Sequence, residues 1–156
     1  MMIHQHSMGA PYVVQRYACY TLVLGRMVEY ATGFSFELSD VLAVLLDGIY
    51  RKYLDHELTI QKPDQLLQLY VQAAGAQKWQ QLYQIGADGT YWGWVKLKRI
   101  DYTALKYCTE NDTPEDRHFH FLLGNDQGHA IWNPDPKVKL ADLESIIYYQ
   151  CKRLVD

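Results

Sequence analysis

Hydrophobic and polar positions follow a helical period in the first half of the chain. Apolar residues recur at three- and four-residue spacing over residues 18–31, 40–53 and 63–74, and we expect a helix in each stretch. Ser39 is the expected N-cap of the second helix. Residues 11–15 precede the first expected helix. They are rich in β-forming residues after Pro11, which favours a short strand or an extended arm.

The second half of the chain changes to the two-residue period of strands. Two hairpins are expected, the first around the Asp88-Gly89 turn. The expected strands cover residues 81–85, 90–97, 117–123 and 129–132. Residues 102–107 fit a strand or a helix, and residues 140–154 return to helical spacing. Helices followed by hairpins predict an α+β fold, with N-terminal helices packed on a C-terminal antiparallel sheet.

Length and composition suit one globular domain. The chain has 156 residues, of which 49% are hydrophobic and 21% charged, enough to bury a core and too apolar for wholesale disorder. The first residues have neither a basic start nor an apolar signal core, so we expect no secretory signal. We predict a flexible tail over residues 1–10 and a single domain over residues 11–156.

Charge and cysteine usage exclude several classes of function. The net charge is −3 and no lysine and arginine stripe is present, which argues against nucleic-acid binding. The apolar run at residues 41–46 stops at Asp47, too short for a membrane span. Cys19, Cys108 and Cys151 lie far apart, without the spacing of a metal site. We therefore expect a cytoplasmic protein without a cofactor, since a reducing compartment suits such cysteines.

Cysteine, histidine and an amide or carboxylate follow one another in an order that suits nucleophilic catalysis. Cys19 falls in the first turn of a predicted helix, where the helix dipole favours the reactive thiolate. His118 and His120 share one face of a predicted strand, so either is a candidate base. Asn133 and Asp135 follow the partner strand and are both candidates to orient the imidazole.

The same order resembles that of the papain-like cysteine peptidase superfamily, over residues 14–136. The motifs are Gln15, Cys19, His120-Phe121-Leu122-Leu123-Gly124 and Asn133-Pro134-Asp135-Pro136. They are most similar to those of its small branch that includes the double-glycine leader peptidases, and to an uncharacterised group of phage- and plasmid-borne proteins.

The resemblance implies a papain-like fold and a thiol hydrolase that cleaves a peptide, isopeptide or other amide bond in a peptide or protein substrate. It implies that Cys19 is the nucleophile and that Gln15 stabilises the oxyanion with the Cys19 backbone amide. His120 matches the family strand better than His118, because Phe-Leu-Leu-Gly follows it. Asn133 and Asp135 both precede a proline as in the family, so the third member stays open.

Three other interpretations stay open. Gln15 stands closer to Cys19 than the family glutamine does, and Tyr20 replaces the family's glycine or tryptophan. These departures favour an inactive papain-like binding module, carried by a phage or mobile element, that engages a host protein or a small molecule. A metal site would use His118, His120 and His129 but has no good fourth ligand. The thirteen tyrosines are the only support for a homo-oligomeric structural protein.

Overall fold

The structure is a computed structural model that describes residues 3–75, 84–85, 91–93, 102–107, 120–125, 129–138 and 149–151. The helices are α1 (Tyr12–Tyr17), α2 (Cys19–Thr32), α3 (Leu38–Tyr50) and α4 (Pro63–Ala73). The strands are β1 (Gln84–Ile85), β2 (Tyr91–Gly93), β3 (Tyr102–Tyr107), β4 (His120–Asn125), β5 (Ala130–Trp132) and β6 (Tyr149–Cys151). Helices first and antiparallel strands after make this an α+β protein, as the sequence predicts.

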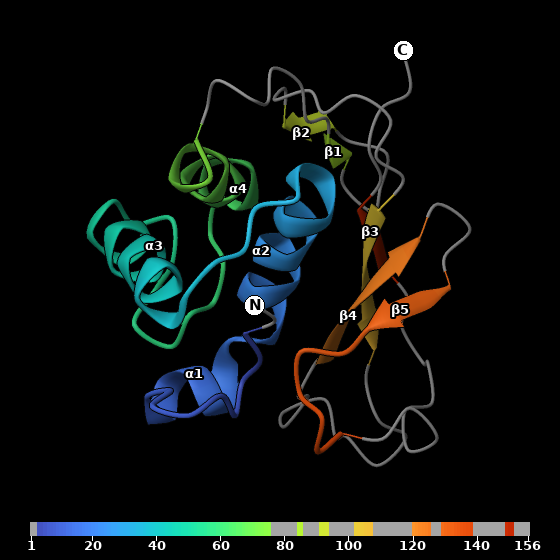
Figure 1. The fold of residues 1–156 in the computed structure, drawn as a ribbon. Coiled ribbons are helices and arrows are strands. Elements are labelled where there is room, and N and C mark those ends of the chain that lie inside the picture. Colours follow the sequence, from blue (N-terminus) through green and yellow to red (C-terminus); the bar gives the residue numbers. More distant parts are fainter. Residues whose placement is uncertain are drawn as a thin grey trace, which may run out of the picture.

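Helix α2 lies between the other helices and the main sheet. Figure 1 shows α3 and α4 on one side of α2, and strands β3, β4 and β5 on the other. The main sheet has the order β5-β4-β3-β6, with every neighbouring pair antiparallel, and β1 pairs with β2 in a separate two-stranded sheet. The N-terminal segment begins beside α2 (Figure 1).

Helix α2 joins the two layers through its first turn. Its apolar positions Val23, Leu24 and Val28 are fully buried, as helical spacing predicts. The rings of Tyr20 and Phe121 stack with centroids 4.1 Å apart, which ties the start of α2 to β4. Such an aromatic pair contributes about 0.5–1.5 kcal/mol beyond its buried area.

The first helix, α1, corrects a sequence prediction. Residues 11–15 were expected to be extended, but Tyr12–Tyr17 is helical. Pro11 has φ −61° and ψ 158° at the N-cap, and its carbonyl accepts the Gln15 N–H at 3.0 Å. Proline restricts the residue before it and suits the start of a helix, so Pro11 permits the helix that follows.

The end of the chain gives a second correction. Residues 140–154 were expected to form one helix, but Tyr149–Cys151 is a strand that pairs with β3, with Ala104 opposite Cys151. Pairing with the edge of a sheet is a long-range contact that local periodicity does not report. Residues 140–148 and 152–154 of that predicted helix lie outside the described residues.

The other boundaries differ by a few residues. Residues 102–107, for which the sequence left strand and helix open, form strand β3. Its register on β4 pairs Tyr107 with His120. Helix α3 begins at Leu38 rather than after Ser39, and Asp40 accepts the Glu37 backbone N–H at 2.9 Å. The predicted strands over 81–85 and 90–97 are described only at β1 and β2, and the Asp88-Gly89 turn lies outside the described residues.

Residues 3–10 pack against the rest of the chain, where the sequence suggested a flexible tail. Ile3 and Ala10 belong to the same buried cluster as residues of α2, α4, β3 and β4. Gln5 is only 2% exposed, and its backbone N–H donates to Pro134 O at 2.7 Å. Burial of Ile3 and a backbone bond across to Pro134 hold this segment in place.

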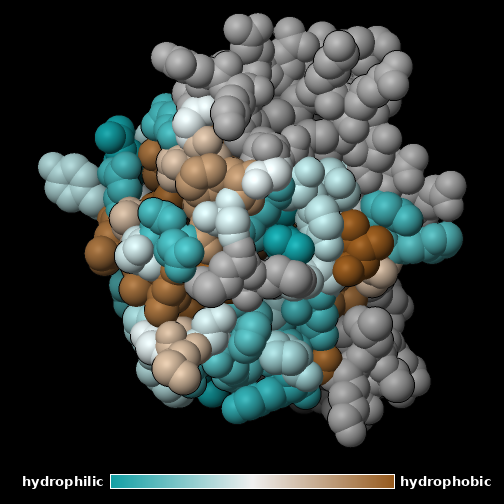
Figure 2. All heavy atoms as spheres, in the orientation of Figure 1, coloured by the Kyte–Doolittle hydropathy of each residue, from teal (hydrophilic) through white to brown (hydrophobic). Residues whose placement is uncertain are grey.

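The described surface mixes polar and apolar residues. Figure 2 shows hydrophobic atoms interspersed with hydrophilic ones over the helices on this face. Leu46 and Tyr50 are exposed on one side of α3. Within the described ranges, no helix is long and apolar enough to cross a membrane.

Candidate functional site

The structure brings His120 and Asn133 together at one end of the β4–β5 hairpin. His120 opens β4, and Asn133 follows β5 directly. Because Trp132 pairs with Leu123 in antiparallel register, the residues after β5 run back alongside the start of β4. His120 Nε2 lies 2.8 Å from Asn133 Oδ1, a hydrogen-bond distance.

The amide of Asn133 is oriented by its own bonds. Its Nδ2 donates to Val138 O at 2.7 Å, and its Oδ1 accepts the Asp135 backbone N–H at 3.0 Å. A carbonyl accepts and an amide N–H donates, so these bonds fix which end of the side chain faces His120. Since Oδ1 is an acceptor, His120 Nε2 carries the hydrogen. In the neutral ring, Nδ1 is then the nitrogen that accepts a proton.

Cys19 is the first residue of α2 and so lies in the first turn of a helix, as the sequence predicts. Helix α2 packs against β4. The backbone N–H groups of Phe121, Tyr20 and Cys19 itself act to lower the pKa of the thiol. Phe121 is the neighbour of His120 in the chain, and its ring stacks on Tyr20, the neighbour of Cys19. The contacts therefore place the cysteine and histidine segments side by side.

The thiol of Cys19 is protonated at neutral pH. Burial raises the pKa of Cys19 to about 11, and the negative charge of Asp135 adds to the rise. The surrounding backbone N–H groups act in the opposite direction and offset only part of it. The sequence predicts a thiolate from the helix dipole, but desolvation of the charged form outweighs the dipole at this site.

The imidazole of His120 is neutral at neutral pH. Burial lowers its pKa, while the hydrogen bond to Asn133 and the charge of Asp135 raise it by less. Desolvation disfavours imidazolium, whereas an acceptor on Nε2–H and a nearby carboxylate favour it. The resting pair is thus a neutral thiol and a neutral imidazole.

Asp135 supports the turn and does not contact the imidazole directly. Its Oδ1 accepts the Lys137 backbone N–H at 2.9 Å. The same oxygen lies 2.9 Å from His6 Nε2, within ion-pair distance but without the alignment of a hydrogen bond. Of the two candidates for the third position, Asn133 is the one bonded to His120, and Asp135 acts on it through its charge.

The other predicted site residues lie elsewhere or are not described. Gln15 is exposed on α1, and its Nε2 donates to Ala10 O at 2.8 Å. One amide hydrogen of the predicted oxyanion donor is therefore used within the helix start. His118 lies outside the described residues, and His129 is exposed directly before β5. Among the described residues, no group of three or more histidine, cysteine, aspartate or glutamate side chains is arranged to hold a metal ion.

Sequence reasoning missed the contribution of Gln5 and His6. Gln5 Nε2 donates to Val14 O at 3.3 Å and to Gln15 O at 3.1 Å, while the Gln5 backbone holds Pro134. The only sequence signal was Ile3, an apolar residue followed by four polar ones, and this pattern is too short to reveal a buried segment.

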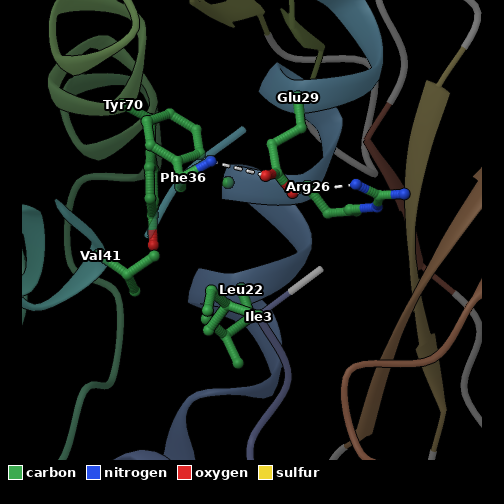
Figure 3. A pocket seen from close by; sticks show the side chains of 8 residues that line it. Ile3, Leu22, Arg26, Glu29, Phe36, Val41 and Tyr70 are labelled. Carbon is green, nitrogen blue, oxygen red and sulfur yellow. Dashed lines mark hydrogen bonds and ion pairs between the residues drawn. The ribbon is translucent and has the colours of Figure 1, made fainter. Parts of the chain in front are cut away.

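A separate pocket lies between α2 and α4, away from Cys19 and His120. Figure 3 shows Glu29 and Tyr70 at its wall, with Glu29 bonded to the Phe36 backbone N–H and paired with Arg26. The pocket measures about 10 Å³, room for roughly one water molecule. It is too small for a substrate. We assign the candidate site to Cys19, His120 and Asn133 because of the His120–Asn133 hydrogen bond and the packing of the Cys19 segment on β4.

Comparison with known proteins identifies no family for this chain. No family model, curated protein or solved structure matches it.

Proposed function

We propose that this protein is a thiol hydrolase that cleaves a peptide, isopeptide or other amide bond, with Cys19 as nucleophile, His120 as base and Asn133 as the residue that orients the imidazole. The observation that carries this proposal is the His120–Asn133 hydrogen bond of 2.8 Å, with the Asn133 amide fixed by its own partners. A structural histidine does not require an oriented acceptor that leaves Nδ1 as the basic nitrogen.

The placement of Cys19 supports the same proposal. A thiol at the start of a helix, packed on a strand of an antiparallel sheet that begins with histidine, is the arrangement that the papain-like resemblance implies. We accordingly propose a papain-like fold for the domain. The proposed substrate is a peptide or protein.

The resting protonation states determine the mechanism. Cys19 and His120 are both neutral, so the proton leaves the thiol as sulfur attacks the acyl carbon. His120 Nδ1 takes that proton, and Asn133 Oδ1 accepts the Nε2–H of the imidazolium that forms. The imidazolium then gives the proton to the leaving amine as the C–N bond breaks. A water molecule, deprotonated by His120, releases the acid product and restores the thiol.

The proposal predicts that Cys19 accepts an acyl group. With p-nitrophenyl acetate, sulfur forms a thioester and nitrophenolate leaves, so the protein gains one acetyl group that intact mass spectrometry detects. Peptide mapping locates it at Cys19, and Cys19→Ala abolishes it. We expect His120→Ala to slow acylation by about 10²–10⁴-fold, the usual contribution of a positioned general base.

His129→Ala is the matched control, because His129 is an exposed histidine of the same hairpin. It should acylate Cys19 at the wild-type rate. Acylation spread over several cysteines or lysines, at a rate that His120→Ala leaves unchanged, would contradict the proposed hydrolase.

One observation favours the second candidate, an inactive binding module on the same fold. A thiol with a pKa of about 11 is ionised in only about one molecule in 10⁴ at pH 7. If His120 does not assist it, Cys19 is an ordinary, partly buried thiol. The acylation experiment separates the two candidates, since a binding module has no His120-dependent step.

A further inference from the structure

Residues 3–10, hereafter the N-terminal strap, connect both sides of the candidate site. On one side, the Gln5 side chain donates to the carbonyls of Val14 and Gln15, in the helix that leads to Cys19. On the other side, the Gln5 backbone N–H donates to Pro134 O, next to Asn133. The strap therefore bridges the segment that carries the nucleophile and the turn that carries the orienting amide.

The strap has its own internal hydrogen bonds. The His4 backbone N–H donates to Ser7 Oγ at 3.0 Å, and the His6 backbone N–H donates to His4 Nδ1 at 3.0 Å. The Ala10 N–H donates to Ser7 O at 2.9 Å, and Ile3 anchors the start of the strap in the core. These bonds fix the position from which His6 reaches Asp135.

A chain of contacts runs from the strap to the imidazole of His120. His6 Nε2 lies 2.9 Å from Asp135 Oδ1, and the Asp135 backbone N–H donates to Asn133 Oδ1 at 3.0 Å. The same Asn133 oxygen accepts from His120 Nε2 at 2.8 Å. A shift of Asp135 would therefore move its backbone N–H, which donates to Asn133 Oδ1. The tautomer of His120 depends on the position of that oxygen.

We propose that His6 is a positioning residue of the candidate site, which holds Asp135 so that Asn133 keeps the His120 imidazole in its Nε2–H tautomer. This inference rests on the proposed function, but the effect of His6 on the His120 tautomer can be tested without substrate. Among the described residues outside the 133–138 turn, His6 is the side chain within ion-pair distance of the Asp135 carboxylate.

The test compares His6→Ala with His6→Gln, both checked by thermal melting for a folded state. The ¹⁵N shifts of the His120 ring, measured by NMR above its pKa, report the tautomer. In His6→Ala we expect a mixture of tautomers in place of Nε2–H alone, and an acylation rate of Cys19 lowered about tenfold by the misaligned base. His6→Gln retains a donor toward Asp135 and should keep the Nε2–H tautomer and the acylation rate of the wild type.

His56→Ala is the control, because His56 is an exposed histidine far along the chain from the strap. If folded His6→Ala keeps the wild-type His120 tautomer, the positioning role is overturned, whatever the acylation rate. Should His6→Ala not fold, Asp135→Asn removes the carboxylate from the same contact and must then disturb the tautomer. If His120→Ala leaves the acylation rate of Cys19 unchanged, the proposed hydrolase is wrong. The NMR measurement of the His120 tautomer still tests the role of His6 in that case.

Discussion

At the scale of single residues, Asn133 is the most fully determined side chain of the site. Its oxygen accepts from His120 and from the Asp135 backbone, and its nitrogen donates to Val138 O. A side chain with all these partners is held in one rotamer without loss of further freedom when a substrate binds. The orientation of His120 is therefore set before any substrate arrives.

Removal of this amide should change how His120 titrates. In Asn133→Ala we expect the pKa of His120 to fall below its wild-type value, because the lost acceptor favoured imidazolium. The acylation of Cys19 should slow by about 10–100-fold, since the base loses its orientation. An NMR titration of the ring measures the first effect, and mass spectrometry measures the second.

Asn125→Ala is a suitable comparison, because the Asn125 side chain accepts a backbone N–H at the opposite end of the same hairpin. It should change neither quantity. An unchanged His120 titration in Asn133→Ala would mean that the hydrogen bond has no influence on the base.

At the scale of elements, helix α2 carries Cys19 and packs closely against helix α4. A Cβ added at Gly25 would lie 2.8 Å from Tyr70 Cε1 and 3.0 Å from Tyr70 Cζ. The Tyr70 ring is fully buried and makes an edge-on contact with Phe36, which restrains its movement. Glycine at this position permits the close approach of the two helices.

Gly25→Ala should therefore destabilise the protein, although alanine suits a helix better than glycine does. Overpacking against a rigid ring typically costs about 1–3 kcal/mol, against a gain of about 1 kcal/mol in helix propensity. Gly48→Ala is the control, because its new Cβ would lie no closer than 3.1 Å to its neighbours, the aliphatic side chains of Leu54 and Leu66. Urea unfolding should rank Gly25→Ala below Gly48→Ala, and the reverse order would show that Tyr70 yields freely.

Helical periodicity predicted the elements of the first half because their apolar stripes are local patterns. Helices α2 and α4 begin and end close to the expected residues. Strand β6 and the buried strap depend on contacts with distant residues, Ala104 and Pro134, which no local pattern reports. The order of Cys19, His120 and Asn133 in the sequence identified the candidate site, but the choice of Asn133 over Asp135 required the geometry of the hairpin end.

At the scale of the whole molecule, the candidate site lies where the helical layer meets the sheet. Helix α2 supplies the thiol, the β4–β5 hairpin supplies the imidazole and amide, and the strap bridges both layers. Burial at this junction raises the pKa of Cys19 and lowers that of His120, so the fold keeps both groups neutral. The sequence predicted a thiolate because the start of the helix can be recognised from the sequence, whereas the burial of the Cys19 thiol between the helix and the sheet cannot.

The pH dependence of Cys19 acylation tests the central claim, that His120 takes the proton of Cys19. In wild type, the rate should rise as His120 loses its proton and level off, with a midpoint below pH 6.5, the ordinary value for histidine. In His120→Ala this step should vanish, and the rate should follow the ionisation of the thiol alone, near pH 11. If wild type and His120→Ala share one profile that rises only toward pH 11, His120 is not the base of this site.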